Sequence, residues 1–422
     1  MDGPEAGTGE LLLPTHVSLP EHRPGFVTIS LFTRPAIRHN LHDERLRPVS
    51  PSSRSRRPSR PPALPALPAP GSHRRSRHVT RPAPSSRPTT VLAMSPATRE
   101  AVLTRRILPE LLRVADVDPD LLVSDFARDD DPGLRGRLAR AEVLFTGWGC
   151  PPLDEEALRR MPRLRAVVHS AGSVKHHVTA ACWERGLLVS SAAAANAVPV
   201  AEYTLAAILF ANKRVLESAH AYRSRRGPVD LLRHYPEAGN YRRTVGLVGA
   251  SLIGRRVMEL LRPFDLRVLV HDPYADPAEV ATLGGELRPL DELLRRSDVV
   301  SLHAPALPET RHLLDASRLA LMPDGATLVN TARGSLVDTA ALTEELVAGR
   351  LHAVLDHTEP EVLPATSPLF DLPNVLLTPH VAGSLGGELD RLATSAVEEL
   401  ERYARGLGFR YPVDPGRLAR SA

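Results

Sequence analysis

The chain has 422 residues, of which 42% are hydrophobic and 24% are charged, so its composition is that of an ordinary globular protein of two or three domains. The formal net charge of +4 is uneven, because residues 1–90 carry +8 and the remainder carries −4. The two cysteines, Cys150 and Cys182, are too few for a disulfide framework or a zinc site and are typical of a reducing cytosol.

The sequence predicts a soluble protein of the cytoplasm. No apolar run approaches the roughly 18 residues of a membrane span. The N-terminus lacks the basic and then apolar segments of a secretory signal. We therefore expect neither a membrane segment nor secretion.

The first 87 residues are rich in proline, arginine and serine, as in the stretch RPVSPSSRSRRPSRPP. Such a segment cannot bury enough apolar surface to offset its ordering entropy, which predicts a disordered extension over 1–87. Its arginines also fit an arm that binds nucleic acid or a protein partner. Phe26 and Phe32 are its only aromatic residues, so platforms for base stacking are missing and a solvated extension is favoured.

From residue 88 onward, short apolar runs alternate with helical patterns. The predicted strands cover 89–94, 143–146, 166–169 and 187–190, then 245–248, 266–271, 299–303, 327–330, 353–356 and 375–377, with a long apolar helix over 200–215 between the two series. Alternating strands and helices indicate parallel, doubly wound sheets. The two series predict an α/β fold with two Rossmann-like domains.

The segment VGLVGASLIG, at 245–254, is typical of a dinucleotide-binding turn. Gly249 and Gly254 occupy the first and third positions of G-x-G-x-x-G between a strand and a helix. Ser251 stands in the middle, where glycine lets the backbone approach a pyrophosphate, and it offers a hydroxyl donor instead. Asp272 ends the next strand at the spacing of the acid that binds the adenosine ribose hydroxyls. No arginine follows it directly, which favours NAD over NADP.

Three further stretches follow predicted strands: NTARGSLVD at 330–338, LDHTEPE at 355–361 and TPHVAGS at 378–384. Ligands of open α/β sheets bind at the carboxyl edge of the strands, so these loops are expected to meet. They supply a guanidinium (Arg333), a carboxylate (Glu361) and an imidazole (His380). Hydride reduction of a 2-oxo acid needs a fork for the substrate carboxylate, a proton donor and a group that tunes the donor.

On these motifs the chain resembles the D-isomer-specific 2-hydroxyacid dehydrogenases, from about residue 89 to 415. HAPALPETRHLL at 303–314 and SSAAAANAVPVAEYTL at 190–205 are similar to further segments of that family. The resemblance implies that Arg333 binds and orients the substrate, that Glu361 pairs with the catalytic histidine, and that His380 is the acid/base. It also implies NAD as the cofactor and a homodimer joined through the cofactor domain.

The resemblance implies ligand-binding positions as well. The substrate carboxylate is received by backbone N–H groups around Ala171, Gly172 and Ser173, in HSAGSVKHH, and by Arg333. Asp356, at a strand end, is expected to hold the nicotinamide carboxamide. The expected cofactor-binding residues are Gly249, Ser251, Leu252, Ile253, Gly254, Asp272, His303, Ala304, Pro305, Thr310, Thr331, Ala332, Asp356 and Gly383.

The implied domain order is discontinuous. A substrate domain covers 88–195, an NAD-binding domain covers 196–382, and a C-terminal helix within 383–415 completes the substrate domain. The substrate itself is a small 2-hydroxy or 2-oxo acid that the motifs do not specify.

The sequence departs from the family pattern at three positions. Ser251 replaces a glycine, His357 stands where valine is usual, and Val362 stands where proline is usual. His357 is expected to disturb packing near the nicotinamide. None of the three changes removes a residue of the catalytic set.

Other polar and aromatic residues receive plainer interpretations. His176 and His177 are adjacent but have no nearby acidic pattern, so we expect them at the surface and predict no metal site. Cys150 and Cys182 are expected to be structural. Trp148 either forms a wall of the substrate pocket or simply packs.

Two alternatives keep the same scaffold. One is an NADH-sensing module, like the C-terminal-binding corepressors, that binds the cofactor but has little turnover. The other is a formate dehydrogenase, which is disfavoured because those relatives pair their histidine with an amide and Glu361 is a carboxylate. Steady-state rates with a panel of 2-oxo acids separate an enzyme from a binding module.

Overall fold

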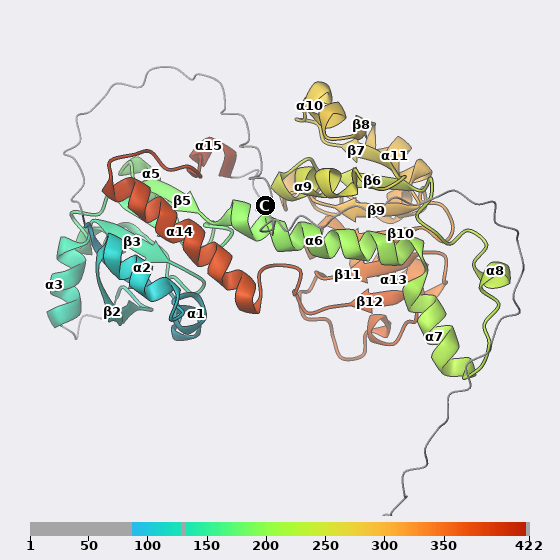
Figure 1. Cartoon of the computed structure of the whole chain (residues 1–422), viewed down its shortest axis with the longest axis horizontal. Helices are drawn as coiled ribbons and strands as arrows, with labels where there is room; N and C mark the ends of the chain where they lie inside the picture. The colour runs from blue at the N-terminus through green and yellow to red at the C-terminus, as the bar shows by residue number, and fades with distance from the viewer. Residues whose placement is uncertain (1–86, 128–131, 419–422) are drawn as a thin grey trace, which may run out of the picture. The chain divides into compact units, whose positions relative to one another are not determined.

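The computed structural model describes residues 87–127 and 132–418 (Figure 1). The extension predicted for 1–87 lies outside the described residues except for Arg87. The Arg87 guanidinium donates to the backbone oxygens of Leu112, at 2.6 Å, and Ala115, at 3.0 Å. Arg87 therefore belongs to the folded part, which corrects the expected boundary by one residue.

The first described region forms a five-stranded sheet in the order β2-β1-β3-β4-β5, and all of its strand pairs are parallel. Its elements are β1 (Thr89–Ala93), α1 (Pro96–Val102), α2 (Ile107–Val114), β2 (Asp116–Val123), α3 (Pro132–Arg140), β3 (Val143–Thr146), α4 (Glu155–Arg160), β4 (Ala166–His169), α5 (Ala180–Glu184) and β5 (Leu188–Ser191).

Both faces of this sheet are covered, as expected for parallel strands. Successive residues of β1 point to opposite faces, so that Val91 packs with helices α3 to α5 and Leu92 packs with α1 and α2. The second face also receives α14 (Leu389–Ala404) from the far end of the chain, through Ala393 and Val397 among others. The chain's last long helix therefore completes the first sheet's core.

Helix α6 (Ala193–Asn212) starts before the predicted segment 200–215 and has Pro199 in its interior. Among the described helices, it alone is long and apolar enough to cross a membrane, with a mean hydropathy of 1.4 over its best window. This corrects the expectation that no apolar run approaches the length of a membrane span. Because α6 packs on α9 and on the strands β9 and β10, it is accounted for as a core helix. Helices α7 (Val215–Arg225) and α8 (Leu231–His234) follow it.

The second sheet has seven parallel strands in the order β12-β11-β10-β9-β6-β7-β8. Its strands are β6 (Thr244–Val248), β7 (Arg267–His271), β8 (Gly285–Leu287), β9 (Val299–Leu302), β10 (Thr327–Asn330), β11 (His352–Leu355) and β12 (Val375–Leu377). Its helices are α9 (Leu252–Leu261), α10 (Pro277–Thr282), α11 (Leu290–Arg296), α12 (Ala316–Leu319) and α13 (Thr339–Val347), and α15 (Pro415–Leu418) ends the described chain.

Helices cover the two faces of this sheet with separate apolar clusters. One face packs against α6 and α9, through residues such as Ile208 and Val257. The other face packs against α11, α12 and α13, through residues such as Leu293 and Leu342. The strand order reverses between β6 and β9, and such a switch point is where open α/β sheets bind their ligands. The predicted α/β class with two Rossmann-like sheets is confirmed.

Two strands escaped the sequence prediction, and both lie at sheet edges. Strand β2, DVDPDLLV, contains Pro119 and three aspartates, which are depleted in strands but tolerated at an edge. Strand β8 has only three residues. Edge strands need fewer apolar residues, so their apolar pattern is weak.

Candidate active site

The turn after β6 contains two glycines at which any side chain would collide with neighbouring backbone atoms. Gly249 has a φ of 107°, and a Cβ on it would lie 2.6 Å from the Ala304 nitrogen. A Cβ on Gly254 would lie 2.1 Å from the Gly249 oxygen. The fingerprint turn and the segment after β9, which carries the predicted residues 303–305, are therefore in direct contact.

Ser251 caps helix α9 at the middle position of the fingerprint. Its φ of −66° is accessible to any residue, and its Oγ accepts a hydrogen bond from the Gly254 N–H, at 3.4 Å. The predicted residues Leu252 and Ile253 form the first turn, where backbone N–H groups lack intrahelical partners and favour an anion. The serine is thus compatible with a pyrophosphate at this helix start.

Asp272 follows β7 and links two loops. One carboxylate oxygen accepts from the Ala250 N–H and the other from the Tyr274 N–H, each at 2.8 Å. The side chain remains partly exposed beside the fingerprint turn. This position agrees with the predicted contact to ribose hydroxyls.

His303 is fully enclosed after β9. Burial lowers the pKa of His303 to about 3, so the ring is neutral, and its Nε2 lies 3.0 Å from Ser301 Oγ. Its Nδ1 is buried without a hydrogen-bond partner in the described part of the chain. Farther along, Thr310 Oγ1 donates to the Pro305 oxygen at 2.7 Å and closes that loop. A glycine cradle, a capped helix start and an unpartnered buried nitrogen together fit a dinucleotide.

Arg333 follows β10 in a loop that Asn330 holds. Asn330 Nδ2 donates to the Arg333 oxygen at 2.9 Å, and Asn330 Oδ1 accepts from the Ala332 N–H at 3.1 Å. Gly334 allows the next loop to approach, because a Cβ there would lie 2.0 Å from the Thr358 oxygen. These contacts explain the asparagine and glycine of the NTARG motif.

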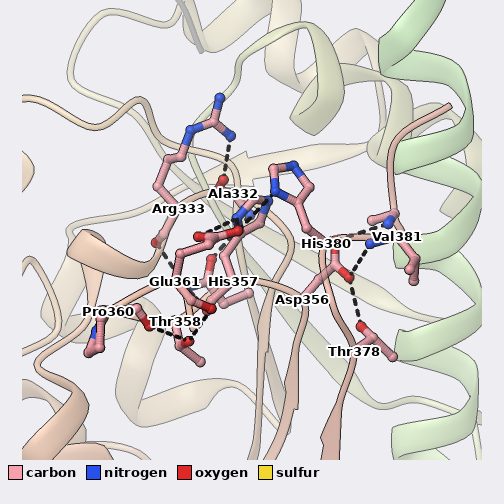
Figure 2. Close-up of polar contacts among 12 residues, drawn as sticks. Ala332, Arg333, Asp356, His357, Thr358, Pro360, Glu361, Thr378, His380 and Val381 are labelled. Carbon is pink, nitrogen blue, oxygen red and sulfur yellow. Dashed lines mark hydrogen bonds and ion pairs between the residues drawn. The ribbon is translucent and has the colours of Figure 1, made fainter. Parts of the chain in front are cut away.

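Figure 2 shows the Arg333 guanidinium beside the Ala332 oxygen, apart from the Glu361 carboxylate. One of its nitrogens donates to the Ala332 oxygen at 2.6 Å, and a large part of the side chain is exposed. Desolvation by the surrounding protein lowers the pKa of Arg333, and the Glu361 carboxylate opposes this shift. The group stays charged at neutral pH, as an anion-binding fork must.

Asp356 anchors the loop that carries His380. Its Oδ1 accepts from Thr378 Oγ1 and from the Val381 N–H, both at 2.7 Å, and its Oδ2 accepts from the Ala382 N–H at 2.9 Å. The side chain is buried. These bonds give Asp356 a structural task in addition to the predicted contact with the carboxamide.

His380 has a left-handed backbone, with a φ of 56°, which is uncommon for a residue other than glycine. Its Nδ1 donates to Glu361 Oε1 at 2.9 Å, so its Nε2 lies on the opposite side of the ring (Figure 2). Both side chains are more than half exposed. Of the predicted set, the carboxylate and the imidazole are therefore in contact, and Arg333 lies on an adjoining loop whose Gly334 approaches Thr358.

His357 is a fourth member of this group. Its side chain is only 3% exposed, and its Nδ1 lies 3.3 Å from Glu361 Oε1. Its ring centroid lies 3.8 Å from that of His380, edge to face. Burial, and then the neighbouring His380, lower the pKa of His357. The structure places His357 against Glu361 and His380, and the expected disturbance near the nicotinamide stays a prediction.

Asn196, near the start of α6, was missed by the sequence analysis. Its Oδ1 accepts from the Ser384 N–H at 3.1 Å, and it lies against the predicted site residue Gly383. A Cβ on Gly172 would lie 3.5 Å from its amide nitrogen. Asn196 thus connects the predicted substrate loop to the loop after His380. Its place within the family-like segment ANAVPVAE was the available signal.

The remaining predicted site residues are placed as follows. Ala171 is buried, and its oxygen accepts from the Ala192 N–H at 3.0 Å. Ser173 Oγ accepts from the Lys175 N–H at 3.4 Å. Thr331 Oγ1 lies 3.0 Å from Thr204 Oγ1 of α6 and is buried. The last of these contacts ties the segment before Arg333 to α6.

Two side chains outside the predicted site need comment. His177 was expected at the surface, but it is 2% exposed and packs against His169, with ring centroids 4.6 Å apart. Its place directly after a tight turn, Val174 to His177, turns the ring inward. Trp148 is 44% exposed, which does not distinguish a pocket wall from packing.

Comparison with known proteins supplies independent information. Residues 205–382 match the family model of the D-isomer specific 2-hydroxyacid dehydrogenase, NAD binding domain. A glyoxylate reductase of Aeropyrum pernix is 34% identical over 312 residues, which cover 72% of this chain and 92% of that one. The chain belongs to the D-isomer-specific 2-hydroxyacid dehydrogenases.

Other family members with different substrates are similarly related. An (S)-sulfolactate dehydrogenase of Chromohalobacter salexigens is 34% identical, covering 68% of this chain and 94% of its own. The crystal structure of a D-lactate dehydrogenase from Aquifex aeolicus, complexed with NAD and lactic acid, is 27% identical, with a TM-score of 0.57 over 75% of this chain and 96% of that chain.

Family membership makes this protein an NAD-dependent hydroxyacid dehydrogenase, and NAD(H) is its cofactor. The predicted family and cofactor are thereby confirmed. Nothing in the comparisons supports the alternative of an NADH-sensing binding module.

Proposed function

We propose that this dehydrogenase interconverts a small D-2-hydroxy acid and its 2-oxo acid, with His380 as the acid/base. The observation that carries the proposal is the 2.9 Å contact between His380 Nδ1 and Glu361 Oε1, at the sheet edge where Arg333 also lies. An imidazole held by a carboxylate is the usual arrangement for a general acid/base whose second nitrogen faces the substrate.

Each residue has a distinct task in the reduction. Arg333 and the backbone N–H groups around 171–173 bind the substrate carboxylate and orient the reacting carbonyl. The cofactor, when bound as NADH, would supply the hydride for the carbonyl carbon. His380 Nε2 donates its proton to the carbonyl oxygen, and Glu361 keeps the ring oriented through Nδ1. In oxidation, His380 Nε2 accepts the proton of the hydroxyl group.

The cofactor would be held by residues that the fold already brings together. The turn 249–254 and the start of α9 would hold the pyrophosphate, and Asp272 would accept hydrogen bonds from the ribose hydroxyls. A 2′-phosphate would meet the Asp272 carboxylate, so NAD(H) is preferred over NADP(H).

The larger-scale assignments are also proposals. The substrate domain comprises 88–195 and 383–415, and the NAD-binding domain comprises 196–382. A homodimer is supported by large exposed apolar side chains between the end of α6 and β6, namely Phe210, Tyr222, Leu231, Leu232 and Tyr241. We place the enzyme in the cytoplasm, as its two unpaired cysteines favour.

The test is NADH oxidation across a panel of 2-oxo acids that includes glyoxylate, hydroxypyruvate and bulkier acids, with NADPH as the control. We expect turnover of at least one acid with NADH and much slower turnover with NADPH. Tight NADH binding with no turnover of any acid would contradict the proposal.

A further inference from the structure

His357, Glu361 and His380 form a compact set of metal-ligating groups. Glu361 Oε1 lies 3.3 Å from His357 Nδ1 and 2.9 Å from His380 Nδ1. One ligand atom of each residue can be chosen so that all of them lie within 4.8 Å of one another. Figure 2 shows both imidazoles directed at the same carboxylate.

This set has the chemistry of a zinc site. Two imidazole nitrogens and one carboxylate oxygen are among the ligand sets that bind Zn²⁺ tetrahedrally, with one position left open. Late first-row metals bind such a set more tightly than Mg²⁺ or Ca²⁺, which prefer sites made of oxygen ligands alone.

The three residues differ in how firmly they are held. His357 is 3% exposed and directly follows Asp356, whose carboxylate is fixed by three hydrogen bonds, so it provides a rigid ligand. His380 and Glu361 are more than half exposed, so a metal ion can reach them and they can adjust around it. The catalytic pair alone would supply only two ligands.

We propose that His357 converts the catalytic pair of this enzyme into an inhibitory Zn²⁺ site with the ligands His357, Glu361 and His380. The inference rests on the proposed function where it concerns inhibition, but the metal site itself does not depend on it. It also revises the sequence-based expectation of no metal site, which had considered only His176 and His177.

The consequence for catalysis follows from the atoms involved. Zn²⁺ takes the place of the proton between His380 Nδ1 and Glu361, and that proton is released to solvent. The zinc-bound ring is then neutral with its remaining proton on Nε2, so it neither gives up that proton to a carbonyl oxygen nor accepts another. Turnover stops, whereas most of the NADH affinity is retained because the predicted pyrophosphate and ribose contacts, at 249–254 and Asp272, lie outside the metal site.

The experiment uses the full-length protein after treatment with a chelator and dialysis. Zn²⁺ binding is measured by calorimetry, and turnover is measured at set concentrations of free Zn²⁺, for the wild type, H357V and H220V. His220 lies on the exposed side of α7 and serves as the matched histidine-to-valine control. Each variant's zinc response is normalised to its own metal-free rate.

We expect one tight Zn²⁺ site per chain in the wild type and in H220V, with inhibition that a chelator reverses. In H357V, Zn²⁺ affinity should fall by roughly 100-fold or more. Removing a residue that only supports a metal ligand costs roughly 10–100-fold in affinity, and the loss of a direct ligand should cost at least the upper value. Equal zinc affinity and inhibition in H357V would overturn the proposal, as would the absence of a tight site in the wild type.

The two proposals fail separately. A wild-type protein that binds one Zn²⁺ through His357 but reduces no 2-oxo acid would leave the metal site standing and refute the proposed function. An active enzyme that shows no His357-dependent zinc binding would support the proposed function and refute the metal site.

Discussion

At the scale of single residues, the site depends on side chains that perform two tasks at once. Asp272 is proposed to bind the ribose hydroxyls, and it joins two loops through the Ala250 and Tyr274 N–H groups. Asp356 lies where the nicotinamide is expected and also fixes the loop of His380. A substitution at such a position should remove the contact to the ligand while keeping the hydrogen bonds that hold the loop.

Asp272→Asn is a suitable test of cofactor choice, because it removes the charge but keeps one acceptor oxygen. We expect weaker NADH binding and a smaller gap between NADH and NADPH affinity, since repulsion of the 2′-phosphate is lost. Fluorescence titration with both cofactors measures this. Asp276→Asn, at the exposed N-cap of α10, is the control. A variant with an unchanged NADH preference would refute the role of Asp272.

The buried histidines His169 and His177 predict a loss of stability in acid. Burial lowers the pKa of His177 to about 4, and burial also lowers the pKa of His169 well below its ordinary value. The unfolded chain therefore binds more protons below its ordinary histidine pKa near 6.5, and the free energy of unfolding falls as pH decreases from there towards 4. Each histidine contributes a slope of up to about 1.4 kcal/mol per pH unit.

Urea unfolding at several pH values measures this slope. Both tryptophans of the chain, Trp148 and Trp183, lie in the first α/β region, so their emission reports on the part that holds these histidines. His177→Gln should make the slope shallower. The same slope in the variant and in the wild type would contradict the assignment.

The sequence could predict most of the site because its residues occur in short motifs after strands. Arg333, Glu361 and His380 are such residues; the structure joins Glu361 to His380 and places Arg333 on the adjoining loop. The contact of His357 with His380 could not be predicted, because the two residues are 23 positions apart in the sequence and meet only through the packing of two loops. The inward rotation of His177 escaped prediction for the same reason, because neighbouring residues give no signal for it.

At the scale of elements, the loop of His380, the proposed acid/base, is held by a chain of hydrogen bonds from α6. Tyr203 on α6 contacts Thr378 Oγ1 at 2.9 Å, and Thr378 donates to Asp356, so the tyrosine hydroxyl is the donor to Thr378. Helix α6 was predicted as an apolar helix only. Its polar residues Asn196 and Tyr203 are what couple it to the loop of His380.

Thr378→Val tests this coupling. The buried Asp356 would lose one donor, which costs about 1–3 kcal/mol, and the loop of His380 would shift. We expect kcat to fall roughly tenfold or more with little change in NADH affinity, because small misplacements of catalytic groups are costly. Thr343→Val removes a comparable hydroxyl in α13 and should leave kcat unchanged. Equal kcat values in both variants would refute the coupling.

Strand positions were predicted well where a strand is buried on both faces, as in β3, β4 and β10, whose residues are all buried. Such strands read as unbroken apolar runs. The edge strands β2 and β8 were missed because each pairs with a neighbouring strand on one side only. Such strands carry fewer apolar residues, so their sequence pattern is weak.

At the scale of the whole molecule, the proposed homodimer rests on apolar side chains left exposed between α6 and β6. Leu232 on α8 is 87% exposed, and Tyr222 on α7 is 65% exposed. Helix α7 has no buried residue. Exposure of neighbouring large apolar residues marks an interaction surface.

Leu232→Glu should therefore weaken self-association, because it places a charge in the expected interface. Sedimentation across a range of protein concentrations measures the dissociation constant. Leu407→Glu, at a 50% exposed leucine after α14, is the matched control and should leave association unchanged. A monomeric wild type, or equal association of both variants, would contradict the proposed surface.

The central claim is that His380 transfers the proton that accompanies hydride transfer. The most direct test is kcat for a good 2-oxo acid in His380→Ala, together with NADH affinity in the same preparation. We predict that kcat falls by roughly 10²–10⁴-fold, as for the loss of a general acid, while NADH affinity is kept. Near-normal kcat in His380→Ala with NADH bound would show that the proton comes from another group.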